Sequence, residues 1–209
     1  MTAPLVEFVS GLVTKIRGPE YVAKLNREMH AHGAFPGHSW RAHIEALERF
    51  VPDLRQKTIL DYGCGPLGGL RQEFGERVIA YDPFVEAFSS PPWARPFDVV
   101  FSSDVFEHIP AGEIPPLLEK IRQSQARYVF LNISTRRAYK ALPNRANAHL
   151  TVRPARWWLN TLTRALAPEF RPALAEDDLL RDEGTFCFER AGDGRASQMA
   201  RSSTSQESL

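Results

Sequence analysis

Three glycines with the spacing G-x-G-x-x-G, Gly63, Gly65 and Gly68, lie in the stretch ILDYGCGPLGG at residues 59–69. Loops of this kind hold nucleotide cofactors, because glycine lets the backbone turn tightly and approach the ligand. The next apolar run, VIAYD, ends in Asp82, and a carboxylate at that place accepts hydrogen bonds from ribose hydroxyls. The pattern predicts a site for NAD or for another adenosine-bearing cofactor.

Two residues near this loop separate the candidate cofactors. Asp61 stands two residues before Gly63 and brings negative charge toward the loop, and Pro66 removes one backbone donor from it. Both features disfavour an anionic pyrophosphate, which binds backbone N–H groups at a helix N-terminus. S-adenosylmethionine carries an ammonium and a sulfonium and has no phosphate, so it suits this loop better. A plain strand-to-helix turn without a ligand is the remaining alternative.

Short apolar runs predict the sheet that positions this loop. TILDY, RVIAY, FDVVFSS and RYVFLNI each indicate a buried strand, and a helix is predicted over Glu113–Gln125 between the last two. The runs FRPALA and TFCFER, which follow an aromatic helix around RWWLNTLTRAL, indicate an antiparallel pair. We therefore expect an α/β, doubly wound, mostly parallel Rossmann-like sheet with an antiparallel C-terminal edge.

The two ends of the chain are expected to differ from this central part. Residues 1–56 are predicted to be a helical lid or extension, with Ser39 as an N-cap and with Ile44, Leu47, Phe50 and Val51 on one helical face. Residues 57–191 would form the main domain. Residues 192–209 have almost no apolar side chains and are predicted to be a disordered tail.

The charge balance gives no electrostatic reason to expect nucleic acid or an anionic membrane as a partner, since 26 Lys and Arg stand against 25 Asp and Glu. Only two cysteines, Cys64 and Cys187, are present and far apart, so a disulfide framework is not expected. The first residues do not resemble a signal peptide, and no run approaches the roughly 20 apolar residues that cross a bilayer. We expect a cytoplasmic protein.

Three stretches, DYGCGP at 61–66, YDP at 81–83 and FDVVFSSDVFEHI at 97–109, resemble successive motifs of the class I S-adenosylmethionine-dependent methyltransferases. The resemblance covers residues 57–133 directly and extends with the edge strands to Arg190. It implies that the glycine loop meets the methionine part of the cofactor, that the second acid holds the ribose, and that residues after the third predicted strand approach the methyl group. The cofactor-binding residues would be Asp61, Gly63, Cys64, Gly65, Pro66, Gly68, Asp82, Pro83, Phe84, Ser103, Asp104 and Val105.

One segment departs from the family pattern. Between Asp82 and the next strand, family members usually place a helix, a further strand and an acid that contacts adenine. This sequence has FVEAFSSPPWAR there, with two adjacent prolines and no strand signal. We expect that strand to be short or missing, and the adenine pocket to be built by Pro83, Phe84, Phe88 or the Ser89–Ser90 pair.

Glu107 and His108 are candidates for proton transfer. A hydroxyl acceptor needs a base, and a histidine with a pKa of about 6.5 suits that task. His108 would be the base, Glu107 would orient its ring or act as the base itself, and Asp104 would contact the cofactor's ammonium or the acceptor. In the alternative interpretation, the Glu-His pair caps the following helix and meets solvent.

Four of the six histidines, His30, His32, His38 and His43, lie in the segment MHAHGAFPGHSWRAH. Crowded imidazoles suggest a metal site, but the spacing matches no closed zinc pattern, and we expect no metal. The glycines and prolines of this segment favour a loop that covers the cofactor. His30, His38 and Trp40 would then line the acceptor pocket, and a purely structural role is the alternative.

A second candidate for the acceptor pocket is the locally basic segment NRANAHLTVRPARWW, where Asn147, His149, Arg153 and Trp157 would contact an anionic small molecule. No Asn-Pro-Pro-Tyr or Asp-Pro-Pro-Tyr tetrad, which resembling enzymes use on nucleic-acid amines, follows the third predicted strand. The length also leaves no room for a separate RNA-binding domain. We expect O-methylation of a small molecule, with no nucleic acid and no membrane as partner. The alternative is a cofactor-binding module without catalysis that acts through a partner protein.

Overall fold

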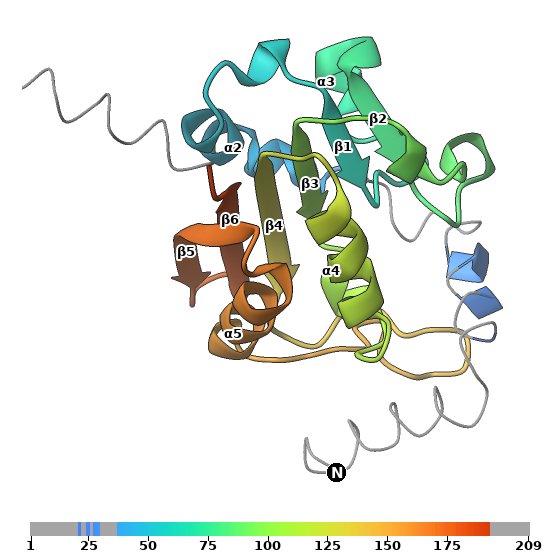
Figure 1. Ribbon diagram of the computed structural model, residues 1–209. Coiled ribbons are helices and arrows are strands. Elements are labelled where there is room, and N and C mark those ends of the chain that lie inside the picture. The colour runs from blue at the N-terminus through green and yellow to red at the C-terminus, as the bar shows by residue number, and fades with distance from the viewer. Residues whose placement is uncertain (1–20, 22–23, 26, 30–36, 193–209) are drawn as a thin grey trace, which may run out of the picture.

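A computed structural model describes residues 21, 24–25, 27–29 and 37–192 of the 209-residue chain (Figure 1). In this part of the chain one sheet has the order β2-β1-β3-β4-β6-β5. β1 pairs in parallel with β2 and β3, β3 pairs in parallel with β4, and β6 is antiparallel to both β4 and β5. The predicted fold class is confirmed. The strands are β1 (Ile59–Tyr62), β2 (Val78–Tyr81), β3 (Val99–Ser103), β4 (Tyr128–Ser134), β5 (Phe170–Asp178) and β6 (Glu183–Arg190).

Helices cover both faces of the sheet, and this is why the central strands read as continuous apolar runs. α4 (Ile114–Gln123) and α5 (Ala155–Leu166) lie on one face, in front of the sheet in Figure 1. On the other face lie η1 (Ser39–Ala42), α2 (Ile44–Phe50) and η2 (Leu54–Gln56). The remaining short elements belong to connections: α3 (Arg71–Phe74), η3 (Gly75–Arg77), η4 (Glu86–Phe88), η5 (Pro92–Ala94) and η6 (Phe106–His108).

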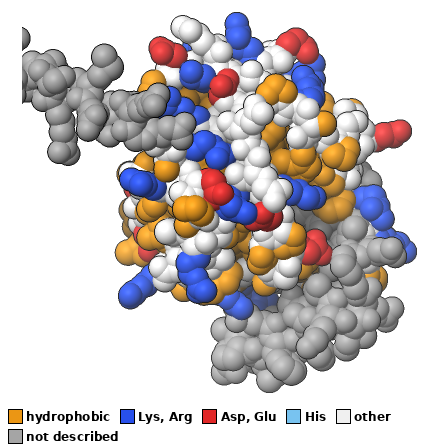
Figure 2. Space-filling model, in the orientation of Figure 1, with side chains coloured by type: hydrophobic (Ala, Val, Ile, Leu, Met, Phe, Trp, Pro, Cys, Tyr) orange, Lys and Arg blue, Asp and Glu red, His pale blue; other side chains and the backbone are white. Residues whose placement is uncertain are grey.

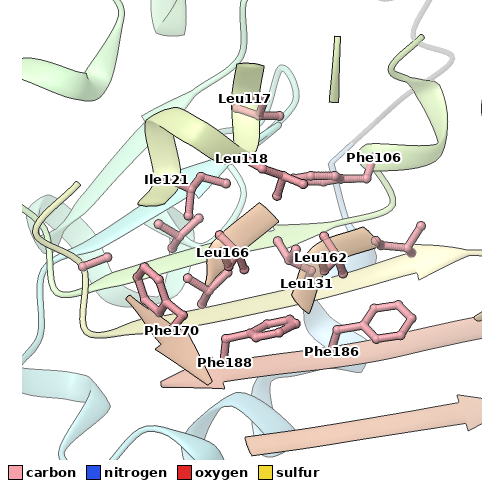
Figure 3. Close-up of a cluster of buried hydrophobic side chains, with 14 of the residues drawn as sticks. Phe106, Leu117, Leu118, Ile121, Leu131, Leu162, Leu166, Phe170, Phe186 and Phe188 are labelled. Atoms are coloured by element: carbon pink, nitrogen blue, oxygen red, sulfur yellow. The ribbon is translucent and has the colours of Figure 1, made fainter. Parts of the chain in front are cut away.

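The larger core cluster fills the space between the sheet and the helices α4 and α5. Figure 3 shows leucines and Ile121 from both helices packed against phenylalanines of β5, β6 and η6. The second cluster lies on the opposite face, where Trp40, Leu47 and Val51 pack on strand residues such as Phe101. Residues 39–56 therefore contribute a layer of the core beneath the sheet. The apolar face predicted for Ile44, Leu47, Phe50 and Val51 packs there.

The connection between β2 and β3 confirms the expected loss of one strand. Residues 82–98 are all described, and they contain the 3₁₀ turns η4 and η5 but no strand, so β2 forms the edge of the sheet. The prediction of Ser39 as an N-cap was wrong: Ser39 is the first residue of η1, and no side chain caps η1 or α2. Residues 1–20, 22–23, 26 and 30–36 of the expected lid and residues 193–209 of the expected tail lie outside the described residues.

The face that carries α4 and α5 shows Lys, Arg, Asp and Glu side chains interspersed, with apolar side chains between them (Figure 2). This mixture agrees with the formal net charge of +1. None of the helices in the described residues has the length and hydrophobicity that a bilayer crossing requires.

Candidate cofactor and acceptor site

The glycine loop leaves β1 and turns over the end of β2. The N–H groups of Gly63 and Cys64 both donate to the carbonyl of Tyr81, at 2.7 and 3.1 Å. Gly63, Gly65 and Gly68 have φ angles of 86°, 67° and 76°, which side chains disfavour. All three glycines of the predicted fingerprint are therefore needed for the path of the backbone. In the same loop Cys64 is buried and Pro66 is exposed.

Asp61 lies beneath this loop and holds it in place. Its Oδ2 accepts a hydrogen bond of 2.7 Å from the backbone N–H of Leu70. A Cβ at Gly69 would lie 2.0 Å from that oxygen, so only glycine leaves room for the bond. Burial raises the pKa of Asp61 to about 7, the Leu70 N–H opposes this, and the charge of Asp82 adds to it. Asp61 is thus a positioning residue, and Gly69 and Leu70 are partners that the sequence analysis missed.

Asp82 ties the glycine loop to the segment after β2. It is 4% exposed, and its two carboxylate oxygens accept hydrogen bonds from the N–H groups of Gly65 at 3.1 Å and of Phe84 at 2.9 Å. Pro83 is exposed and Phe84 is half-buried beside it. The predicted acid at the end of β2 therefore lies against the predicted glycine loop.

The end of β3 faces the same loop. Asp104 has a left-handed φ of 55°, and the Val105 side chain fills the space where a Cβ of Gly63 would lie. The Ser39 hydroxyl lies 3.3 Å from the carbonyl of Ser103 and also interacts with the Asp104 carboxylate. Burial raises the pKa of Asp104, and this contact with Ser39 opposes the shift.

The segment before η1 covers the glycine loop. A Cβ at Gly37 would lie 2.4 Å from the carbonyl oxygen of Cys64, so these two backbones approach closely only because Gly37 lacks a side chain. Together with the contact of Ser39, this places residues 37–39 across the carboxyl ends of β1 and β3. Gly37 and Ser39 were not predicted at the site, although Gly37 follows a proline in a segment expected to form a loop.

Glu107 is fully buried in η6, at the same edge of the sheet. One carboxylate oxygen accepts a hydrogen bond of 3.3 Å from the Ser134 N–H, and the other, Oε2, has no hydrogen-bond partner among the described residues. Burial raises the pKa of Glu107 well above its usual range, and the nearby Asp104 carboxylate adds to the shift. Asp104 and Glu107, which were predicted as separate site residues, are thus close to one another.

His108 and His149 lie edge to face, with ring centroids 4.8 Å apart and planes at 87°. His108 Nδ1 contacts the carbonyl of Ala148 at 2.9 Å, and His149 Nδ1 contacts the carbonyl of Arg136 at 2.7 Å. Because a carbonyl only accepts, each Nδ1 carries the hydrogen, and in the neutral ring Nε2 holds the lone pair. Burial lowers the pKa of His149. His108 and His149, predicted for different roles, therefore belong to one cluster.

The other predicted acceptor residues are dispersed. Trp40 is 7% exposed and packs in the core beneath the sheet, so the structure does not place it in a pocket. The Asn147 side chain bonds to the backbone N–H and carbonyl of Ala138 and to the N–H of His149, which makes it a link within its own loop. Arg153 stacks over Trp157 at 5.6 Å, and Trp157 packs beside the core. His38 is exposed, and His30 lies outside the described residues.

Comparison with known proteins gives likeness in structure alone. No family model matches the sequence, and no curated protein matches it. A solved structure of the 1,6-didemethyltoxoflavin N1-methyltransferase of Burkholderia thailandensis, with S-adenosylhomocysteine bound, is similar at a TM-score of 0.53 and 13% identity, over 84% of this chain and 91% of that one. The fold is that of the class I S-adenosylmethionine-dependent methyltransferases. The expectation that followed from the sequence motifs is therefore confirmed for the fold.

The expectation that nucleic acid is excluded as a partner was wrong. The similar structures include the 16S rRNA methyltransferase RmtF, at a TM-score of 0.49, 13% identity, and coverage of 89% of this chain and 76% of that one. They also include an rRNA methylase of Escherichia coli, at a TM-score of 0.38 and 14% identity, over 91% of this chain and 78% of that one. Nucleic acid therefore stays among the candidate partners.

Proposed function

We propose that this protein is an S-adenosylmethionine-dependent methyltransferase whose cofactor binds at the carboxyl ends of β1, β2 and β3. The observation that carries the proposal is the buried Asp82 at the end of β2, whose carboxylate accepts the Gly65 N–H of the glycine loop. Asp104 lies beside the same loop at the end of β3, where the next residue, Val105, packs against Gly63. An ammonium and a sulfonium are attracted by such a site, whereas a pyrophosphate is repelled. The short α3, of four residues, also supplies little helix dipole for a phosphate.

The parts of the cofactor can be assigned to the described residues. The loop from Gly63 to Gly68 would contact the methionine part, Asp82 would accept from the ribose hydroxyls, and Ser103 to Val105 would lie nearest the methyl group. Residues 37–39 would cover the cofactor, because Gly37 lies against the glycine loop and Ser39 contacts the end of β3. The S-adenosylhomocysteine bound to the Burkholderia thailandensis enzyme supports this choice of cofactor.

The acceptor is proposed to be a small molecule that is methylated on oxygen, with His108 as the base. His108 donates its Nδ1 hydrogen to Ala148, so Nε2 is the atom that takes the acceptor's proton. The loop that follows β4 is tied to η6, since the Thr151 N–H donates to the Glu107 carbonyl at 2.9 Å. This link keeps His149 beside His108 in the proposed acceptor pocket.

Calorimetry with S-adenosylmethionine, S-adenosylhomocysteine and NADH tests the cofactor. We expect both sulfur compounds to bind and NADH not to bind, and the opposite pattern would refute the assignment. A mass-spectrometric screen with labelled cofactor, a metabolite pool and ribosomal RNA then tests the acceptor. A methylated RNA, or a product methylated on nitrogen, would refute the proposed acceptor. Cofactor binding without any product would favour a binding module that acts through a partner.

A further inference from the structure

Glu107, His108 and His149 offer three ligand-capable side chains at one place outside the glycine loop. One donor atom of each lies within 4.8 Å of the donor atoms of the other two. Donor atoms that share a metal ion at about 2.0–2.2 Å lie roughly 3–4 Å apart, so small side-chain rotations close this group around an ion. The sequence could not indicate the cluster, because His149 lies 41 residues beyond His108.

The backbone around these side chains is held in register by several hydrogen bonds. Thr151 donates from its N–H to the carbonyl of Glu107 at 2.9 Å and from its hydroxyl to the carbonyl of Ile109 at 2.7 Å. The ring of His108 adds a bond from Nδ1 to Ala148 across the same gap. The loop carrying His149 is therefore attached to η6 on both sides of that histidine, and the cluster does not depend on the placement of one side chain.

Both imidazoles are oriented in the way that metal ligands usually are. A histidine that binds a metal through one nitrogen generally donates its other N–H to a carboxylate or backbone carbonyl, which fixes the tautomer and the ring orientation. His108 and His149 each donate Nδ1–H to a backbone carbonyl, at 2.9 and 2.7 Å. In both neutral rings the lone pair is thus on Nε2, which is the atom a metal would take.

Glu107, the third side chain of the cluster, has a buried carboxylate oxygen that could bind a cation. Glu107 is 0% exposed, and its Oε2 has no hydrogen-bond partner among the described residues. The Asp104 side chain lies in hydrogen-bond contact with Glu107, and Glu183 lies nearby, so further oxygen atoms surround this place. Arg136 provides an opposing positive charge near Asp104 and His149. A buried carboxylate oxygen without a donor is costly, and a bound cation would satisfy it.

We propose that Glu107, His108 and His149 form a binding site for one divalent transition-metal ion. Two imidazoles and one carboxylate suit Zn²⁺, Fe²⁺, Co²⁺ or Mn²⁺, whereas Mg²⁺ and Ca²⁺ prefer oxygen ligands alone. Three protein ligands leave at least one coordination position open, as in catalytic rather than structural zinc sites. The metal would occupy the ring nitrogen that His108 would otherwise use as a base, so the metal-loaded protein would not use His108 in that role.

The test measures metal binding by the whole chain without cofactor, so its result does not depend on the proposed methyl transfer. The protein is stripped with a chelator and titrated with Zn²⁺ by calorimetry and with Co²⁺ by visible absorption. We expect one equivalent of each ion to bind, with a Co²⁺ ligand-field spectrum typical of nitrogen and oxygen ligands. A stripped protein that binds neither ion would overturn the proposal, and so would a stoichiometric site with a thiolate spectrum.

Single substitutions then locate the site. Glu107→Gln, His108→Ala and His149→Ala should each weaken Zn²⁺ binding by about 10- to 100-fold or more, while His38→Ala, which removes an exposed histidine outside the cluster, should leave it unchanged. Circular dichroism shows which variants fold. His149→Ala lies on a loop and should fold even where a change in η6 does not. Unchanged Zn²⁺ affinity in a folded His149→Ala protein would overturn the proposed ligand set.

Discussion

Substituting Gly69 by alanine tests how Asp61 holds the glycine loop. The backbone of Gly69 has φ of 50°, and the new Cβ would lie 2.0 Å from Oδ2 of Asp61. That oxygen accepts the Leu70 N–H at 2.7 Å, so the methyl group must displace the acceptor of a buried bond. Neither the backbone nor the carboxylate can yield at low cost, because both are enclosed.

Two separate costs add to the expected loss of stability. Alanine in the left-handed region costs about 1–2 kcal/mol. A broken bond that leaves the Leu70 N–H without an acceptor costs about 1–3 kcal/mol. We therefore expect Gly69→Ala to lower the free energy of unfolding by about 2–5 kcal/mol, which corresponds to roughly 4–20 °C in Tm for a chain of this size.

A double-mutant cycle isolates the collision from the backbone strain. The strain of alanine at φ 50° is the same with and without the Asp61 carboxylate, so it cancels when Gly69→Ala is also made in an Asp61→Ala background. Urea unfolding of the four proteins should give a coupling energy of about 1–3 kcal/mol. Gly112→Ala, where a Cβ would meet nothing within 4 Å, is the control and should be nearly neutral. Additive effects of the two substitutions would refute the proposed contact between Gly69 and Asp61.

Four further predictions concern the site and the core. Because the pKa of Asp61 is raised from 3.8 to about 7, the folded state binds an extra proton between these values. Stability should therefore fall as pH rises from about 4 to 7, and urea unfolding of Asp61→Asn should lack this slope. Asp82→Ala should weaken S-adenosylmethionine binding about 10- to 100-fold by calorimetry, since it removes the acceptor of the Gly65 N–H and the proposed ribose ligand. Equal affinity in a folded mutant would contradict this role. In protein stripped of metal, where His108 is free to act as the base, His108→Ala should lower kcat by roughly 10²–10⁴ with cofactor affinity retained, and near-normal turnover would exclude the histidine from the reaction. Trp158→Ala, at a fully buried position, should cost about 3–5 kcal/mol of unfolding free energy, and the half-buried Trp157→Ala clearly less; equal losses would contradict the assigned packing.

Sequence features that act over a few residues were sufficient to predict the sheet. The β-branched runs from TILDY to RYVFLNI became β1 to β4, because alternating short apolar segments have few other ways to bury both faces. The adjacent prolines of the segment after Asp82 correctly indicated that one strand is missing, since proline cannot donate within a ladder. The tight turn predicted from the glycine spacing is also present, since Gly63, Gly65 and Gly68 each have positive φ.

Tertiary structure alone decided how the site's polar groups are paired. The sequence indicated that Asp61 and Asp82 lie at one sheet edge, but only the fold shows that they bond to Leu70 and to Gly65. Local pattern also suggested that Trp40 lines a pocket, whereas it packs in the core beneath the sheet. Contacts of this kind depend on the angle at which each loop returns to the sheet, which is not encoded in residue spacing.

The cluster of Glu107, His108 and His149 shows most clearly what residue spacing could not predict. Each residue was a candidate by type, and His149 was assigned to a different part of the pocket from the other two. Their meeting depends on the Thr151 N–H reaching the carbonyl of Glu107 and on the Ala148 carbonyl reaching His108, bonds that span about 40 residues. Residue type and local spacing determined which side chains can act as ligands or bases, and the long-range backbone bonds determined which of them act together, because only the folded chain brings distant segments within hydrogen-bond distance.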